Sequence, residues 1–206
     1  MTAAPTPALR RRVNTRARLV EAAEDVFVRK GLKRVTVDDL VGAAGFTRGA
    51  FYSNFSSIEE VFFAVFEQQS QRMLEIVRGV VESVPEGDFS LDSVGLILDA
   101  LNPVGRRWYI IQTEFTLLAL RNESARQVLA DQRAGFEGQM RGAIGDVVRR
   151  LGRTPTIPIE QLSETAVALY LHSLAQEGLG QGGLDPRQLV EMVLPGVILG
   201  LSRESD

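Results

Sequence analysis

Apolar residues recur at helical spacing along most of this chain. Within residues 16–30 they form a stripe of the kind that faces a core, at Leu19, Ala22, Ala23, Val26 and Phe27. Comparable stripes predict helices over residues 58–83, 91–101, 106–121, 124–151 and 159–177, and another that begins at Asp185 and Pro186. Asn102 and Pro103 are expected to end the helix over 91–101. Since no segment shows the alternation typical of strands, the pattern predicts an all-α fold.

Two short helices are predicted between residues 36 and 55. Thr36 precedes an apolar face at helical spacing, and Asp39, three residues later, can complete a capping box. Gly45 can end this helix, because glycine tolerates positive φ. Thr47 can cap the next helix, whose first turn is residues 48–50. Two short helices joined by a tight turn indicate a helix-turn-helix motif.

The second short helix has a free face suited to a DNA major groove. Gly49 and Ala50 have almost no side chain, so the tip of this helix can approach another surface closely. Phe51 and Phe55 lie four residues apart and are expected to face inward. The outward side chains then supply a cation, a phenol, a hydroxyl and an amide, at Arg48, Tyr52, Ser53 and Asn54.

Three pieces follow one another in the first third of the chain, RLVEAAEDVFVRKG, VTVDDLVGAAGFTRGAFYSNF and SSIEEVF. In order and spacing these pieces, within the segment from about Thr15 to Phe66, resemble the DNA-binding domain of TetR-family transcriptional regulators. One position departs from the family pattern. The family usually has a lysine just after the cap of its fourth helix, within reach of a phosphate, and this chain has Ile58.

Residue chemistry and the resemblance together suggest a set of DNA contacts. Hydroxyls suited to phosphate oxygens come from Thr36, Thr47, Tyr52 and Ser53. Arg48 can donate two hydrogen bonds to guanine, whereas Asn54 reads a base or steadies the backbone. The resemblance implies that base edges meet Arg48, Gly49, Ala50 and Tyr52, and that the first helix approaches the DNA backbone near Arg16.

Charge is distributed unevenly along the 206 residues. Residues 1–56 contain ten Lys/Arg against five Asp/Glu, a net charge of +5, whereas the remainder carries −8, which gives −3 in total. A basic segment that coincides with the helix-turn-helix favours nucleic acid as a partner. The organisation expected is a disordered basic arm over 1–13, a DNA-binding domain over 14–56 and a helical body over 57–206.

The body offers a candidate ligand pocket. Aromatic, methionine and amide side chains fall on helices that should face one another, at Trp108, Gln112, Phe115, Phe136, Gln139, Met140 and Tyr170. Such a mixture can line an apolar cavity with a few orienting polar groups, and it can equally be ordinary core. The resemblance implies a small-molecule effector, which this lining would make apolar or aromatic.

The last two predicted helices offer a candidate dimer interface. Their apolar and small residues exceed what one small body needs, and the set is Leu162, Ala166, Leu169, Ser173, Leu189, Met192, Val193, Gly196 and Gly200. The resemblance implies that two such helices pair with their twins in a four-helix interface. A twofold dimer would place two reading helices on palindromic half-sites.

The sequence therefore predicts a homodimeric, ligand-responsive DNA-binding regulator, most often a repressor in this family. An enzyme is disfavoured, because the chain has one histidine, no cysteine and no common catalytic motif. No metal or cofactor is expected, and without a signal peptide or apolar span the location expected is cytoplasmic. The alternative is a helical dimeric adaptor that binds a protein partner and whose helix-turn-helix is idle.

Overall fold

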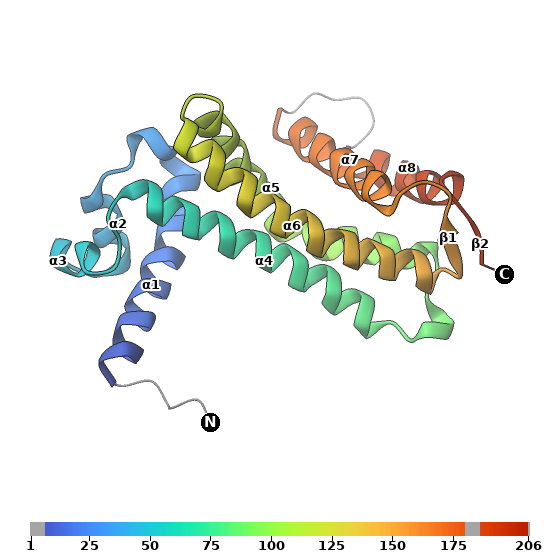
Figure 1. The fold of residues 1–206 in the computed structure, drawn as a ribbon, viewed down its shortest axis with the longest axis horizontal. Helices are drawn as coiled ribbons and strands as arrows, with labels where there is room; N and C mark the ends of the chain where they lie inside the picture. The colour runs from blue at the N-terminus through green and yellow to red at the C-terminus, as the bar shows by residue number, and fades with distance from the viewer. Residues whose placement is uncertain (1–6, 180–185, 206) are drawn as a thin grey trace. The chain divides into compact units, whose positions relative to one another are not determined.

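A computed structural model describes residues 7–179 and 186–205 of the chain, and it is helical almost throughout (Figure 1). The helices are α1 (Pro7–Lys30), α2 (Val37–Ala44), α3 (Arg48–Tyr52), α4 (Ile58–Ser83), α5 (Leu91–Ala119), α6 (Glu123–Arg150), α7 (Ile159–Leu179) and α8 (Pro186–Gly200). Short 3-10 turns lie at Leu32–Arg34 and Glu86–Asp88. The all-α prediction is confirmed.

The chain divides into two compact units. Unit 1 consists of Met1–Gln69 together with Ile110–Leu118, and unit 2 consists of Ser70–Tyr109 together with Ala119–Asp206. The predicted boundary after residue 56 is therefore wrong, because the first half of α4 and part of α5 belong with the helix-turn-helix. The physical reason is aromatic packing. The Phe115 ring of α5 contacts those of Phe62 and Phe66, with centroids 5.8 and 4.9 Å apart.

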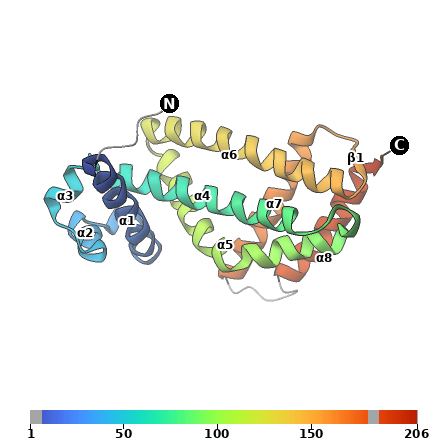
Figure 2. The same cartoon turned by 90° about the horizontal axis from the view of Figure 1, so that it is seen from below.

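Unit 1 is built on fully buried aromatic residues. Helices α1, α2 and α3 gather around the start of α4 (Figure 2). Phe27 of α1 meets Phe62 of α4 edge to face at 5.1 Å, a favourable geometry for aromatic pairs. Phe51 and Phe55 are 0% and 2% exposed, as their spacing predicted, so they fix α3 to this core.

Two helix boundaries differ from the sequence prediction. Helix α1 begins at Pro7 and not near Arg16, so residues 7–13 do not form the predicted disordered arm; residues 1–6 lie outside the described part. Proline is tolerated in a first helical turn, and the arginines that follow it are good helix formers. Helix α5 also continues through Pro103. The buried side chains of Leu101 and Val104, on either side, offset the lost hydrogen bond.

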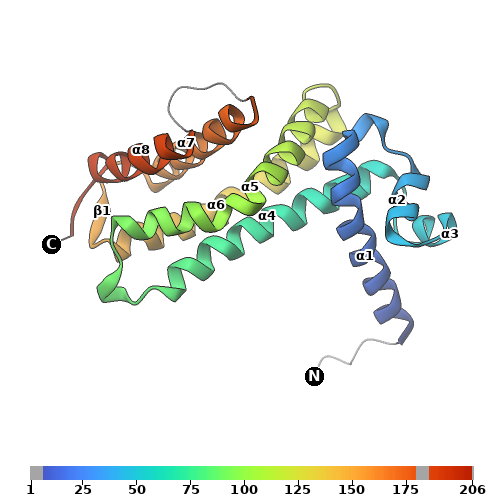
Figure 3. The ribbon, with the colours of Figure 1, turned by 180° about the vertical axis from the view of Figure 1, so that it is seen from behind.

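Unit 2 contains the second core. Helices α7 and α8 lie side by side in Figures 1 and 3 and pack against each other. Arg150 near the end of α6 donates from Nη1 to the carbonyl oxygens of Val81 and Val84, at 2.5 and 2.6 Å. These bonds satisfy the Val81 carbonyl in the last turn of α4, where carbonyls lack a partner within the helix, and the Val84 carbonyl just after it.

A small sheet closes the chain, although no strand was predicted. Strand β1 (Arg153–Pro155) pairs antiparallel with β2 (Ser202–Glu204), with Thr154 opposite Arg203. Arg153 Nε donates to Ser202 Oγ at 2.7 Å and anchors the segment after α8. Each strand has three residues, too few for an alternating pattern to appear in the sequence. Among the described residues, no helix is long and apolar enough to cross a membrane.

Candidate nucleic-acid interface

The start of α2 is fixed by a complete capping box. Asp39 N donates to Thr36 Oγ1 at 3.3 Å, and Thr36 N donates to Asp39 Oδ2 at 3.0 Å. Lys30 at the end of α1 donates to the other carboxylate oxygen of Asp39 at 2.6 Å. The bond from Lys30, followed by those from Thr36, lowers the pKa of Asp39 to about 2. This carboxylate therefore joins α1 to α2.

The turn between α2 and α3 follows the sequence prediction. Gly45 takes the left-handed conformation, with φ 70° and ψ 34°, and ends α2. Thr47 caps α3 and accepts a hydrogen bond from Ala50 N at 3.2 Å. Since Thr36 and Thr47 both accept backbone hydrogen bonds, these two of the four predicted phosphate-binding hydroxyls are also helix caps.

Helix α3 presents a bare and exposed tip. A Cβ built on Gly49 would find its nearest neighbour, Thr47 Oγ1, at an ordinary contact distance of 3.8 Å. Arg48 and Gly49 are exposed, Ala50 is half-buried, and Tyr52 is 62% exposed. The phenol of Tyr52 therefore stands free of the core while its neighbour Phe51 is fully buried. Five residues of helix are thus anchored on one side and open on the other.

Ser53 and Asn54 form hydrogen bonds back to the helix. Ser53 Oγ donates to the Gly49 carbonyl at 2.8 Å, and Asn54 Nδ2 donates to the Ala50 carbonyl at the same distance. Asn54 is half-buried. Of the two roles that the sequence left open for Asn54, this geometry matches the one that steadies the backbone.

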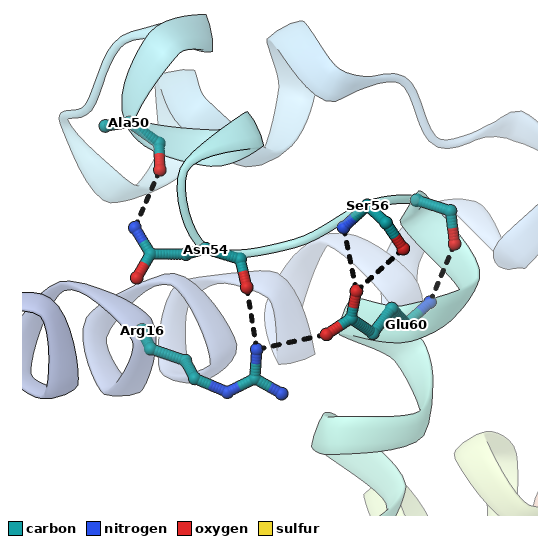
Figure 4. A network of polar contacts seen from close by, with 6 residues as sticks. Arg16, Ala50, Asn54, Ser56 and Glu60 are labelled. Atoms are coloured by element: carbon teal, nitrogen blue, oxygen red, sulfur yellow. Dashed lines mark hydrogen bonds and ion pairs between the residues drawn. The ribbon is translucent and has the colours of Figure 1, made fainter.

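Arg16 forms contacts within the protein, where the sequence predicted a DNA contact. Its Nη1 donates to the Asn54 carbonyl at 2.9 Å and to Glu60 Oε1 at 3.2 Å, and its guanidinium lies 4.1 Å from the Phe55 ring centroid. Glu60 Oε2 accepts from both the amide and the hydroxyl of Ser56, at 2.7 and 2.9 Å. Figure 4 shows the hydrogen bonds of Arg16 and Glu60 around the segment that links α3 to α4.

Sequence reasoning missed Asp38, which pairs with the predicted base-reading residue. Arg48 Nε donates to Asp38 Oδ1 at 2.6 Å, and Arg48 Nη2 donates to Asp38 Oδ2. In the sequence, Asp38 lies in the first turn of a predicted helix, where an acidic residue indicates only a favourable interaction with the helix start. The side chain that it meets lies ten residues further along the chain.

A separate apolar cavity lies within unit 2. Its volume is about 100 Å³, and Trp108, Phe136, Met140 and Tyr170 line it as predicted, with aliphatic residues of α4 to α8 around them. Gln112, Phe115 and Gln139 do not line it. Phe115 and Gln112 belong to unit 1, and Gln139 accepts a hydrogen bond from Arg78 on the exposed surface. Helical spacing could not assign these residues to one unit or the other.

The predicted dimer residues divide by exposure. Leu162 and Ser173 are buried within the chain itself, at 0% and 5% exposure, so their place on an outer surface was predicted wrongly. Met192 is 67% exposed; Gly196 and Gly200 are exposed. Half-buried residues of this set are Ala166, Leu169 and Val193, and the Leu189 side chain lies outside the described part. The exposed members lie mainly on α8.

Comparisons with known proteins agree with this architecture. Residues 19–65 match the family model described as "Bacterial regulatory proteins, tetR family". The chain is 33% identical over 113 residues to the uncharacterized HTH-type transcriptional regulator YfiR of Bacillus subtilis, and the match spans 55% of each protein. It is 26% identical over 184 residues to the HTH-type transcriptional repressor AcnR of Corynebacterium efficiens, over 87% of this chain and 92% of that one.

Solved structures share the fold at low sequence identity. A putative transcriptional regulator from Rhodococcus sp. RHA1 has a TM-score of 0.75 at 16% identity, over 89% of this chain and 95% of that one. A TetR-family regulator from Cytophaga hutchinsonii has a TM-score of 0.73 at 17% identity, over 98% and 100%. The family segment coincides with the helix-turn-helix of unit 1, and over residues 19–65 the chain matches the TetR family of bacterial regulatory proteins.

Proposed function

We propose that the chain is a sequence-specific DNA-binding transcriptional regulator that reads a major groove with the start of α3. The observation that carries this proposal is the open tip of α3. Arg48, Gly49 and Tyr52 are exposed on a short helix whose Phe51 is buried. A groove-reading helix needs this combination, because its free face must enter the groove while its opposite face holds it rigidly.

The charge of the N-terminal segment supports the same function. The net charge of +5 over residues 1–56 offers attraction to phosphates, whereas the remainder of the chain is acidic. Regulators of this family are not enzymes, which agrees with the sparse catalytic residues in the sequence. A cytoplasmic location, where DNA is available, is part of this proposal.

The proposal extends to a homodimer that responds to an effector. The exposed apolar and small residues of α8, chiefly Met192, Gly196 and Gly200, would meet a twin subunit and place two α3 tips on a palindrome. The effector would be an apolar or aromatic small molecule, because the cavity in unit 2 is lined by Trp108, Phe136 and aliphatic side chains. Repression would end when the effector binds.

The size of the cavity suggests how an effector acts. Pockets for drug-sized ligands commonly measure about 300–1,000 Å³, and this one measures about 100 Å³. A larger effector therefore requires the lining helices to separate. An effector that binds the expanded form more tightly than the DNA-bound form would shift the population and release the operator.

The decisive experiment selects duplexes from random DNA with the purified full chain. A regulator is expected to enrich a palindromic sequence, with an affinity that falls steeply as salt rises, because Lys and Arg displace counterions. Enrichment of no sequence would contradict the proposal. A helical adaptor with an idle helix-turn-helix would give that result, together with a shallow dependence on salt.

A further inference from the structure

Asp38 holds the guanidinium of Arg48 by one edge. Nε donates to Oδ1 at 2.6 Å and Nη2 donates to Oδ2, so the side edge of the planar group is occupied. A guanidinium has five N–H donors in a fixed fork. The end edge, formed by Nη1 and the second hydrogen of Nη2, is not used by this pair. That edge carries the two parallel donors that match O6 and N7 of guanine.

Asp38 is itself well anchored. It lies in the first turn of α2, where the positive end of the helix dipole favours a carboxylate. The next residue, Asp39, closes the capping box with Thr36 and accepts a hydrogen bond from Lys30 of α1. Arg48, in contrast, is the first residue of α3 and has a long side chain with many rotamers. The ion pair therefore joins a long, flexible side chain to a short one that stands on a rigid backbone.

Folding stability does not account for this pair. The side chains of Arg48 and Asp38 are 65% and 63% exposed, and ion pairs this exposed contribute little to stability. Their mutual hydrogen bond lowers the pKa of Asp38 and raises that of Arg48, which favours the charged form of each group. The effect of the pair falls on the orientation and the charge of Arg48.

Building on the DNA-reading function proposed above, we propose that Asp38 is a specificity-determining positioning residue, which orients Arg48 toward one guanine. The pair reduces the conformational entropy that Arg48 loses when it binds a base. It also neutralises a cation that would otherwise attract any phosphate. Asp38 thus favours the chosen base pair over other DNA, without touching DNA itself.

A double-mutant cycle tests this role on the selected duplex. The Arg48→Ala variant first identifies the base pair at which sequence preference is lost. The quantity then measured is the ratio of two affinities, one for the selected duplex and one for the same duplex with that base pair substituted. Asp38→Ala is expected to lower this ratio roughly tenfold, within the range of one bidentate base contact. In the Arg48→Ala background, Asp38→Ala is expected to change nothing. Glu137→Ala, which removes the exposed Arg133–Glu137 ion pair of α6, is the matched control.

The outcomes separate this role from the proposed function. If Arg48→Ala lowers the ratio and Asp38→Ala leaves it unchanged, Asp38 has no positioning role, although the chain still reads DNA. If Asp38→Ala alters the ratio even when Arg48 is absent, Asp38 contacts DNA directly and the inference is wrong. If the wild-type chain selects no duplex at all, the DNA-reading function fails and this inference fails with it.

Discussion

Arg16 of α1 and Glu60 of α4 form an ion pair across the segment that links α3 to α4, with 3.2 Å between Nη1 and Oε1. The same guanidinium nitrogen binds the Asn54 carbonyl, and the second oxygen of Glu60 binds Ser56. The hydrogen bond from the Ser56 amide, more than the contact with Arg16, holds the pKa of Glu60 below its usual range. Two charged residues thus hold the segment that follows α3, at Asn54 and Ser56 (Figure 4).

Substitution of Arg16 distinguishes positioning from phosphate binding. Arg16→Met is expected to weaken binding to the selected duplex, because the segment after α3 loses the contacts that hold it in place. The slope of log affinity against log salt is expected to stay unchanged. Loss of a phosphate contact would reduce the magnitude of that slope by about 0.9. Glu60→Gln is the companion variant, since it keeps the positive charge of Arg16 and weakens the ion pair between the two residues. A reduced slope in Arg16→Met, with wild-type affinity in Glu60→Gln, would restore Arg16 as a DNA contact.

The capping box of α2 makes a prediction about acid. Asp39 has a folded-state pKa of about 2 against an ordinary 3.8. A lowered pKa contributes stability that is fully present above 3.8 and is lost as the pH falls toward about 2. Asp39→Asn is therefore expected to melt below wild type at neutral pH, by a difference that shrinks across this window. Thermal denaturation followed at stepped pH measures it, and a difference that stays constant down to pH about 2 would contradict the assignment.

The helix-turn-helix could be predicted from sequence because its signals are local. Thr36, Gly45 and Thr47 each set a cap or a turn through atoms within four residues. The Arg16–Glu60 ion pair could not be predicted, since 44 residues separate its partners. Arginine at a helix face is equally suited to a phosphate or a carboxylate, and only the fold decides between them.

In the helical body, too, the sequence could not show which residues meet in space. Helical spacing placed Trp108 and Phe115 in one candidate pocket, because residues seven apart on a helix share a face. The fold assigns Trp108 to the cavity of unit 2 and Phe115 to the aromatic core of unit 1. At Pro103 the sequence predicted a helix end that the structure does not have. Proline locally favours a helix end, but the residues buried on both sides of it stabilise a continuous α5.

Gly105 gives unit 2 a sharp packing test. A Cβ at this buried position of α5 would collide with the Tyr170 hydroxyl and lie 3.1 Å from Leu174 Cδ2. Gly105→Ala is therefore expected to lower the melting temperature, although Gly→Ala in a helix normally stabilises by about 0.5–1 kcal/mol. Gly95→Ala on the same helix is the control. A Cβ there has no neighbour within 4 Å among the described residues, so the usual gain is expected. Equal stabilisation by both variants would contradict this packing.

Met192 tests the proposed dimer surface. Its side chain is 67% exposed on α8, so Met192→Glu is expected to leave the helical circular dichroism unchanged and to convert a dimer into a monomer. Sedimentation velocity measures the change, because a charge buried between subunits is costly. Leu96→Glu, at a side chain 51% exposed on α5, is the matched control and should remain dimeric. Dissociation caused by Leu96→Glu and not by Met192→Glu would place the interface elsewhere.

The central claim is that the bare tip of α3 enters DNA, and the affinity of Gly49→Leu for the selected duplex tests it most directly. The backbone leaves room for a side chain to begin at Gly49, because a Cβ there meets only an ordinary contact with Thr47. Gly79→Leu adds the same bulk on α4 in unit 2, where a Cβ also has no close neighbour among the described residues. We predict that Gly49→Leu loses affinity by about tenfold or more, equivalent to ~1.4 kcal/mol, and that Gly79→Leu binds as wild type. Undiminished binding by a folded Gly49→Leu protein would contradict the claim.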